Sequence, residues 1–271
     1  MELLSAQIFA LILFFGAIAG VLAGLLGIGG GVILVPLFLW LFPLAGIPEQ
    51  LIVHMAFGTS LAIIIPTSIS STLGHRKRGN VDWSMVGYLA LGGAVGAFIG
   101  STAAACLDGS ILKVSFGVMQ IVVSLKLLFF HPRLPPETRE RPKSRSLLLI
   151  GLCGGIFSAF FGVGGGVIAV PLMLIILRLP IHLAVGNSSA LIIVSSIFGT
   201  VSYLYHGLQQ PVQAAFSLGY VNLLVAFIVA PLTILCARLG VKLATRTSQD
   251  KLIKIFAVML MIVGLKIIFN S

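Results

Sequence analysis

Charged residues are scarce in this sequence. Asp, Glu, Lys and Arg together make up 9% of the 271 residues, and hydrophobic residues make up 58%, whereas soluble domains carry about 25% charged residues. This composition excludes an ordinary soluble domain. Because the apolar runs are long and lack the alternation of membrane β-strands, the sequence predicts an all-α integral membrane protein.

Acidic side chains are the rarest charged group, and none lies inside an apolar segment. The seven acids fall at termini, at segment ends or in polar stretches: Glu2, Glu49, Asp82, Asp108, Glu137, Glu140 and Asp250. A cation pathway or proton relay through a membrane is expected to display a buried carboxylate. The sequence therefore does not favour either one.

The residue groupings of an enzyme or a metal site are also missing. Cys106, Cys153 and Cys236 have no paired or metal-ligand spacing and fall in or beside apolar segments, so we expect small, buried hydrophobic side chains. The five histidines are scattered along the chain. We expect no catalytic residue, no metal and no cofactor, and so a protein that is not an enzyme.

No cleavable signal is recognisable at the N-terminus. The start, MELLSAQIFALILFFGAIAG, has no basic residue before its apolar run, so the first segment is expected to stay in the protein. A net charge of +10 would suggest nucleic acid in a soluble domain. Here the Lys and Arg residues lie in short loops beside apolar segments, which is the positive-inside pattern. We expect a lipid bilayer around the chain and no nucleic-acid partner.

What the sequence does contain is a duplication. GLLGIGGGVILVPLF (24–38) aligns without a gap with AFFGVGGGVIAVPLM (159–173) at a constant offset of 135. HMAFGTSLA (54–62) matches HLAVGNSSA (182–190), and LKLLF (125–129) matches LKIIF (265–269). The chain is therefore interpreted as two transmembrane repeats, 1–130 and 147–271, joined by a polar linker at 131–146 and forming one membrane domain.

Each repeat is predicted to hold about five helical segments. The apolar runs lie near 6–26, 32–45, 50–73, 83–105 and 111–130, then near 147–161, 167–179, 182–204, 213–236 and 251–269. The first two segments of each repeat are predicted to be broken or re-entrant helices, because those at 147–161 and 167–179 are shorter than the roughly 20 residues of a perpendicular span. Five segments, or three spanning ones, is an odd number, so the repeats are expected to have inverted topology.

The charges favour the same topology. RKRGN (76–80) aligns with LYHGL (204–208), which has lost every Lys and Arg. With the N-terminus outside, all Lys and Arg residues except Lys113 and Lys266 fall on or near the cytoplasmic side. This asymmetry indicates inverted repeats and a cytoplasmic linker.

Four glycines in five positions interrupt each aligned apolar stretch. A break there leaves the first N–H groups of the next helix without partners, at the positive end of its dipole, and glycine lets a ligand approach that backbone. Two facing breaks predict an anion site. Its candidate residues are Gly29, Gly30, Gly31, Gly164, Gly165 and Gly166. Close helix packing is the alternative, and it is the favoured interpretation of Gly16, Gly20 and Gly24.

Polar residues at the start of the following helices supply further candidates. The predicted substrate contacts are Thr59, Ser60, Asn187 and Ser188, which occupy equivalent positions in the two repeats. A small polar stripe continues along each helix: Ser60, Thr67 and Ser71 in the first repeat, Ser188, Ser195 and Gly199 in the second. The hydroxyls either line a cavity or bond their own backbone carbonyls.

These motifs resemble those of the sulfite exporter TauE/SafE family of membrane permeases. The resemblance rests on the paired glycine stretches, on GTSLA (58–62) and GNSSA (186–190), and on HRKRGNVDW (75–83), and it covers nearly the whole chain. It implies a multi-pass permease of the bacterial inner membrane. The implied cargo is a small sulfur-containing anion such as sulfite, sulfoacetate or another organosulfonate, often moved outward.

The predicted function is therefore a secondary transporter that exports a small anion by alternating access around the glycine site. A passive anion channel of the same architecture stays open as the alternative. The exact cargo, the direction, the coupling ion and a homodimeric state are also left open by the sequence.

Overall fold

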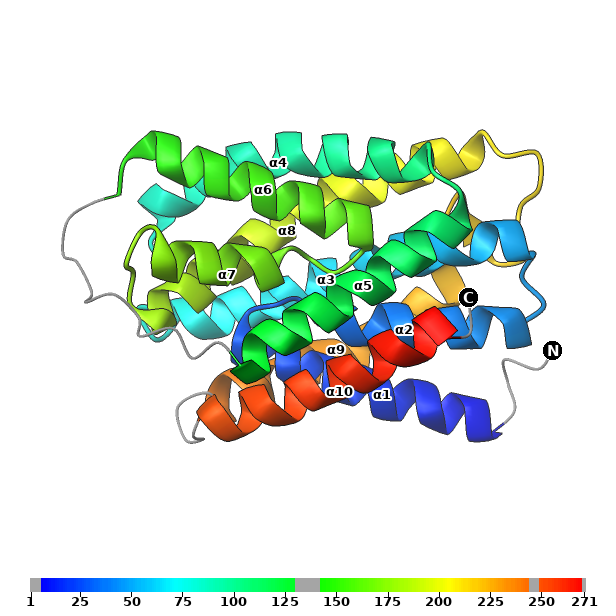
Figure 1. The fold of residues 1–271 in the computed structure, drawn as a ribbon, viewed down its shortest axis with the longest axis horizontal. Coiled ribbons are helices and arrows are strands. Elements are labelled where there is room, and N and C mark those ends of the chain that lie inside the picture. The colour runs from blue at the N-terminus through cyan, green and yellow to red at the C-terminus, as the bar shows by residue number, and fades with distance from the viewer. Residues whose placement is uncertain (1–5, 130–141, 244–248, 270–271) are drawn as a thin grey trace.

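The computed structural model describes residues 6–129, 142–243 and 249–269 (Figure 1). Within these ranges the chain is almost entirely helical, which confirms the predicted all-α class. Seven helices, α1, α3, α4, α5, α6, α8 and α9, are long and apolar enough to cross a membrane. The elements are α1 (Ala6–Leu26), α2 (Gly31–Leu44), α3 (Glu49–Arg76), α4 (Trp83–Ala105), α5 (Gly109–Phe129), α6 (Ser144–Phe161), α7 (Gly166–Ile175), α8 (Ile181–Leu208), β1 (Ser217–Leu218), β2 (Val221–Asn222), α9 (Leu223–Leu243) and α10 (Gln249–Phe269).

Several predicted boundaries differ from the structure. α3, α8 and α9 end at Arg76, Leu208 and Leu243, later than the predicted 73, 204 and 236. A helix was expected from residue 213, but β1 and β2 pair there as a short antiparallel hairpin, and its turn contains Gly219 at a left-handed φ of 53°. α7 ends four residues earlier than expected, at Ile175, because Arg178 adopts φ 52° and the residue before Pro180 is disfavoured in a helix. α6 begins at Ser144, inside the predicted linker, whose residues 131–141 lie outside the described part.

α1 and α2 form one hairpin, and α6 and α7 form another. α2 has 14 residues and α7 has 10, which correspond to lengths of about 21 Å and about 15 Å. A hydrocarbon core is about 30 Å thick. Neither short helix can therefore cross it alone.

The third helices of the two repeats, α3 and α8, run antiparallel where they touch. Ser71 of α3 is hydrogen-bonded to Ser189 of α8 at 3.1 Å. Gly199, further along α8, packs against Leu61, which lies earlier on α3. The last helices of the two repeats, α5 and α10, also run antiparallel and pack against each other over their length (Figure 1). Repeat-equivalent helices thus face each other head to tail.

Glycines let helices of opposite repeats approach each other closely. α4 lies beside α6, as Figure 1 shows, and α1 lies beside α9. A Cβ added to Gly20 of α1 would lie 2.7 Å from the carbonyl oxygen of Thr233 on α9, and Gly16 and Gly24 face the same helix. The packing interpretation of these three glycines is confirmed.

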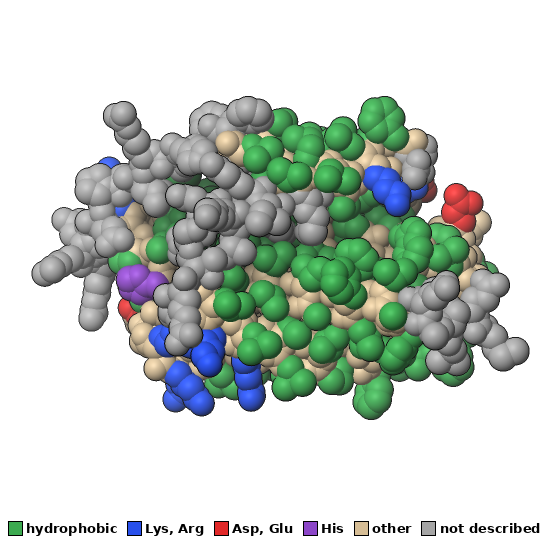
Figure 2. Space-filling view, turned by 90° about the horizontal axis from the view of Figure 1, so that it is seen from below, with side chains coloured by type: hydrophobic (Ala, Val, Ile, Leu, Met, Phe, Trp, Pro, Cys, Tyr) green, Lys and Arg blue, Asp and Glu red, His purple; other side chains and the backbone are tan. Residues whose placement is uncertain are grey.

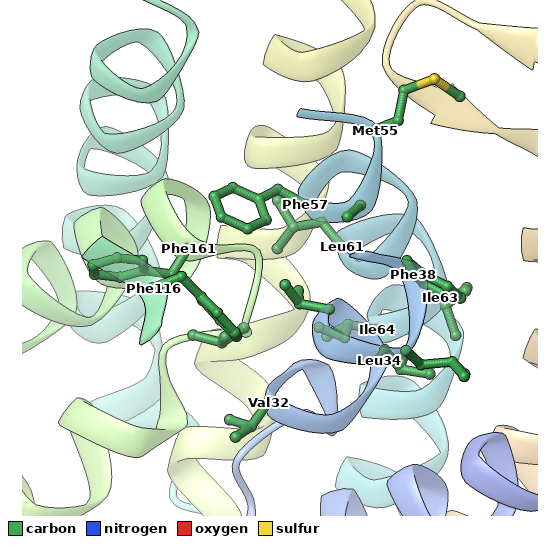
Figure 3. Packing of buried hydrophobic residues seen from close by; sticks show 14 of the residues in the cluster. Val32, Leu34, Phe38, Met55, Phe57, Leu61, Ile63, Ile64, Phe116 and Phe161 are labelled. Atoms are coloured by element: carbon green, nitrogen blue, oxygen red, sulfur yellow. The ribbon is translucent and has the colours of Figure 1, made fainter. Parts of the chain in front are cut away.

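The main hydrophobic core fills the space between the first hairpin and helices α3, α5 and α6 (Figure 3). The ring of Phe116 on α5 lies between those of Phe57 on α3 and Phe161 on α6, with centroid distances of 5.7 Å and 6.3 Å. Val32 and Leu34 at the start of α2 are buried in the same core. The break before α2 is therefore held in a packed interior.

Charged side chains lie at the two ends of the helix bundle. The helix directions place most of the described Lys and Arg residues at the end where α3 stops and α4, α6 and α8 start, and Lys113 and Lys266 at the other end with Glu49 and Asp108. Figure 2 shows basic side chains gathered near one end of the molecule, a smaller basic patch and acidic side chains near the other end, and hydrophobic side chains between the two ends. This is the segregation of charge that the sequence predicts.

Candidate functional site

Both glycine clusters form tight breaks with the same backbone conformation. In the first, Gly27, Gly29 and Gly30 have φ of 63°, 84° and 79°; in the second, Gly162, Gly164 and Gly165 have φ of 67°, 87° and 74°. L-residues with a side chain rarely adopt this left-handed region, and glycine adopts it without a steric penalty. Gly30 and Gly165 then occupy the position before the first residue of α2 and α7. The duplicated sequence thus folds into the same break twice.

The two breaks touch each other inside the bundle. A Cβ built on Gly29 would lie 3.4 Å from the Cα of Gly164, and one built on Gly31 would lie 2.5 Å from the carbonyl oxygen of Gly162. Residues 27–31 and 162–166 are all buried. The glycines are needed for this close packing, and the packing brings together the two helix N-termini that the sequence analysis predicted as an anion site.

Amide groups at the start of α2 and α7 have no acceptor in the described part of the chain. The earliest internal donors of these helices are the third and fourth residues, which bond the carbonyl oxygens of Gly30 and Gly165 at 3.0 to 3.2 Å. The four N–H groups without an acceptor belong to Gly31, Val32, Gly166 and Val167. They carry the positive ends of two helix dipoles. An arrangement of this kind can bind an anion through the backbone alone.

Asn187 and Thr59 each hold the start of a helix in the opposite repeat. The Oδ1 of Asn187 accepts the N–H of Asp82 at 2.8 Å, and the Oγ1 of Thr59 accepts the N–H of Asn222 at 2.9 Å. Asp82 and Asn222 stand immediately before α4 and α9. Both acceptors are fully buried. Their predicted role as substrate contacts stays a prediction.

Ser188 and Ser60 lie close to the breaks but differ in their bonding. Ser188 donates to the carbonyl oxygen of Gly27 at 3.0 Å and so fixes α8 to the first break. Ser60, at the equivalent position of α3, is fully buried, and its hydroxyl has no partner among the described residues. Of the two hydroxyls, that of Ser60 is the one without a hydrogen bond among the described residues.

A second set of hydroxyls, not predicted from the sequence, lies beside the predicted stripe. They are Ser68 and Thr72 on α3 and their repeat equivalents Ser196 and Thr200 on α8, all buried and without a hydrogen-bond partner in the described structure. Within the predicted stripe, Thr67 donates to Thr233 of α9 at 2.7 Å and Ser71 is hydrogen-bonded to Ser189, whereas Ser60 has no partner among the described residues. The available signal was the spacing of eight and twelve residues from Ser60 and Ser188 in both repeats.

The cysteines differ from expectation. Cys236 is buried, but Cys106 and Cys153 are exposed, so burial was wrongly predicted for these two. Cys153 points outward because the neighbouring Gly151 and Gly155 form the face of α6 that packs on α4. Among the described residues, no three His, Cys, Asp or Glu side chains come together as a metal site.

Seven apolar helices of spanning length and two buried helix breaks that touch each other define a multi-pass membrane protein with broken helices. The family model described as sulfite exporter TauE/SafE matches residues 12–267. The chain belongs to this family.

Relatives of similar length carry the names of membrane transporters. The chain is 31% identical to a probable membrane transporter protein of Haemophilus influenzae over 94% of this chain and 96% of that protein. It is 31% identical to the probable membrane transporter protein MJ0441 of Methanocaldococcus jannaschii over 94% and 93%, and 26% identical to the probable membrane transporter protein YunE of Bacillus subtilis over 97% and 98%. No solved structure gives a significant match. The family and these relatives identify a membrane transporter.

Proposed function

We propose that this protein is a secondary transporter that exports a small sulfur-containing oxyanion, such as sulfite or an organosulfonate, across the inner membrane of a bacterium. The observation that carries the proposal is the group of four backbone amides without acceptors where the two buried breaks meet. The described acidic side chains, Glu49, Asp82 and Asp108, lie at helix ends or in loops, so no carboxylate opposes an anion there.

Binding at this point requires the two hairpins to separate, because the breaks are packed against each other. Oxygen atoms of the cargo would then accept hydrogen bonds from the starts of α2 and α7. The antiparallel contact of the equivalent helices α3 and α8 supports inverted repeats, and such repeats can exchange conformations to open the site to either side. Export of an anion from a negative interior gains about 2.3 kcal/mol per charge at 100 mV.

The amide site is tested by removing one N–H without changing its surroundings greatly. In Val32→Pro the N–H of the second residue of α2 is lost, and proline is tolerated in the first turn of a helix. Val32→Ala is the matched control because it shortens the same side chain and keeps the N–H. Val167→Pro and Val167→Ala form the corresponding pair in α7.

The measurement is uptake of sulfite, sulfoacetate, sulfate, acetate and chloride into vesicles containing each purified variant. Hydrogen bonds to charged groups contribute about 1.5–3 kcal/mol, so each proline variant should transport its preferred sulfur anion about 10- to 100-fold more slowly than the alanine variant. Equal rates within both pairs would rule out the amide site. Equal rates of all five anions in the wild type would contradict the sulfur-anion cargo.

The same vesicles separate a transporter from the passive channel that the sequence leaves open. A transporter saturates with the anion and exchanges labelled anion outside for unlabelled anion inside. A flux that rises linearly with concentration and shows no exchange would support the channel.

A further inference from the structure

Buried hydroxyl groups without partners are concentrated on the two helices beside the glycine breaks. In the described part of the chain nine buried side-chain polar atoms have no hydrogen-bond partner. Six of them are hydroxyls on α3 or α8: Ser60, Ser68, Thr72, Ser196, Thr200 and Ser202. Buried polar groups are normally paired, and each exception in a native structure calls for an explanation. Their concentration on one helix pair indicates a shared function.

Four of these hydroxyls are equivalent in pairs. Ser68 corresponds to Ser196 and Thr72 to Thr200, in the alignment that also matches His54 with His182. The arrangement therefore occurs once in each repeat, at equivalent positions of α3 and α8.

The orphaned hydroxyls face the contact between α3 and α8. Leu61 and Ser71 of α3 both contact α8, through Gly199 and Ser189. At 3.6 residues per turn, Ser68 projects between these two side chains. Ser68 and, one turn later, Thr72 thus lie at the α3–α8 interface, and the same spacing relative to Ser189 and Gly199 places Ser196 and Thr200 there on α8.

An isoleucine beside the breaks precedes the pair of hydroxyls on each helix. Ile64 lies four residues before Ser68, and its equivalent Ile192 lies four residues before Ser196. The Cδ1 of Ile64 would be 2.8 Å from a Cβ on Gly31, and the Cγ2 of Ile192 would be 3.2 Å from a Cβ on Gly164. Both isoleucines are fully buried, and Figure 3 shows Ile64 beside α2.

The antiparallel arrangement places Thr72 and Thr200 beyond the two isoleucines, toward opposite ends of the bundle. The contacts Ser71–Ser189 and Leu61–Gly199 set Ser196 level with Ile64 and Ser68 level with Ile192. α3 runs toward the basic end of the bundle, so Ser68 and Thr72 extend from Ile64 in that direction. α8 runs the opposite way, so Ser196 and Thr200 extend toward the other end. A hydrophobic constriction between two polar segments can close a path by excluding water.

We propose that the α3–α8 interface is the translocation path for an oxyanion, with Ile64 and Ile192 as its closed hydrophobic gate. Ser68 and Thr72 line the half on the basic side, Ser196 and Thr200 line the half on the other side, and their hydroxyls donate hydrogen bonds to the oxygens of the passing anion. This inference rests on the transport function proposed above. It adds a path and a gate to the amide site.

Accessibility to a charged thiol reagent tests the path. The background is a protein with Cys106, Cys153 and Cys236 replaced by serine, into which Thr72→Cys or Thr200→Cys is introduced. Ile69→Cys and Ile197→Cys are matched controls, because these positions are equivalent in the two repeats and each isoleucine is 41% exposed on the outer surface of the bundle. A membrane-impermeant methanethiosulfonate cannot reach lipid-facing positions.

The expected result is modification of Thr72→Cys from one side of the membrane and of Thr200→Cys from the other. Sulfite, or whichever anion of the panel the wild type carries, should slow both reactions at least fivefold, and the two control variants should stay unmodified. If Thr72→Cys and Thr200→Cys react no faster than the controls in vesicles that do transport the anion, the path is wrong. Modification in vesicles that carry no sulfur anion would instead contradict the proposed function and support the path.

A second measurement tests the gate. The double variant Ile64→Ala/Ile192→Ala should let the anion leak down its gradient at least tenfold faster than wild type, without saturation. Ile63→Ala is the control, because Ile63 is equally buried but points to a different side of α3. An unchanged leak in the folded double variant would overturn the gate.

Discussion

At the scale of single residues, the two repeats meet one requirement with different side chains. Thr59 and its equivalent Asn187 each accept the backbone N–H that precedes a helix of the opposite repeat, at 2.9 Å and 2.8 Å. The shared property is a side-chain oxygen at this position. The polarity of Asn187, which made it a candidate ligand contact, is used to join the repeats.

Substitution of Asn187 separates a structural role from a role in binding. Asn187→Ala leaves the N–H of Asp82 without its acceptor, so we expect a loss of about 1–3 kcal/mol in the free energy of unfolding. Asn187→Thr supplies a hydroxyl acceptor, as Thr59 does, and should recover most of that stability. Thermal unfolding of the purified variants measures both. An alanine variant as stable as wild type but unable to transport would instead identify Asn187 as a substrate contact.

Gly30 and Gly46 form a matched pair for testing the break. Their φ angles are 79° and 71°, so an alanine at either position pays a similar left-handed penalty of about 1–2 kcal/mol. A Cβ on Gly30 would also lie 2.7 Å from the carbonyl oxygen of Ala19, whereas nothing lies within 4 Å of one on Gly46. Gly30→Ala should therefore lower the melting temperature more than Gly46→Ala and abolish vesicle uptake. Equal effects would show that the break tolerates a side chain.

At the scale of helices, glycine contacts between the repeats determine how closely α4 and α6 pack. A Cβ on Gly155 of α6 would overlap the backbone of α4 at Gly93, while a Cβ on Gly87 of α4 meets nothing within 4 Å. Such small-residue contacts let membrane helices approach closely. Gly92, Gly96 and Gly100 of α4 approach the backbone of α6 in the same way.

The consequence can be measured with one valine at each position. Gly155→Val should destabilise the protein by about 1–3 kcal/mol through overpacking, or prevent its recovery as a monodisperse protein from detergent. Gly87→Val, on the exposed side of α4, should behave as wild type. Size-exclusion profiles and thermal unfolding compare them, and similar behaviour of both variants would contradict the packing role of Gly155.

Features of the helices that depend on local sequence could be predicted, and those that depend on packing between the repeats could not. Helices and glycine breaks are encoded locally, by apolar runs and by a duplicated motif, and their positions were predicted closely. The side chains that stay without partners on α3 and α8 depend on which face meets the other repeat, and the partner of Asn187 lies 105 residues away in the chain. The hairpin at 217–222 was not predicted, because its apolar residues continue the apolar run that predicted a helix from residue 213.

For the whole molecule, the two ends of the bundle differ in charge because most of the described Lys and Arg residues lie at one end. The turn at Lys77 to Gly79 lies at the basic end, and the loop with Cys106 and Asp108 lies at the other. Basic segments near a membrane surface gain about 1 kcal/mol per Lys or Arg from the anionic cytoplasmic leaflet. The basic end is therefore expected to face the cytoplasm, with the N-terminus outside.

Two exposed positions test this orientation in whole cells. Cys106 is exposed and, kept as the sole cysteine, should react with an impermeant maleimide in intact cells. Lys77→Cys in the cysteine-free protein should react only after the membrane is permeabilised, because Lys77 is exposed at the basic end. The opposite pattern would reverse the topology. Reaction of both cysteines in intact cells would mean that the protein inserts in both orientations, which the strong segregation of basic residues argues against.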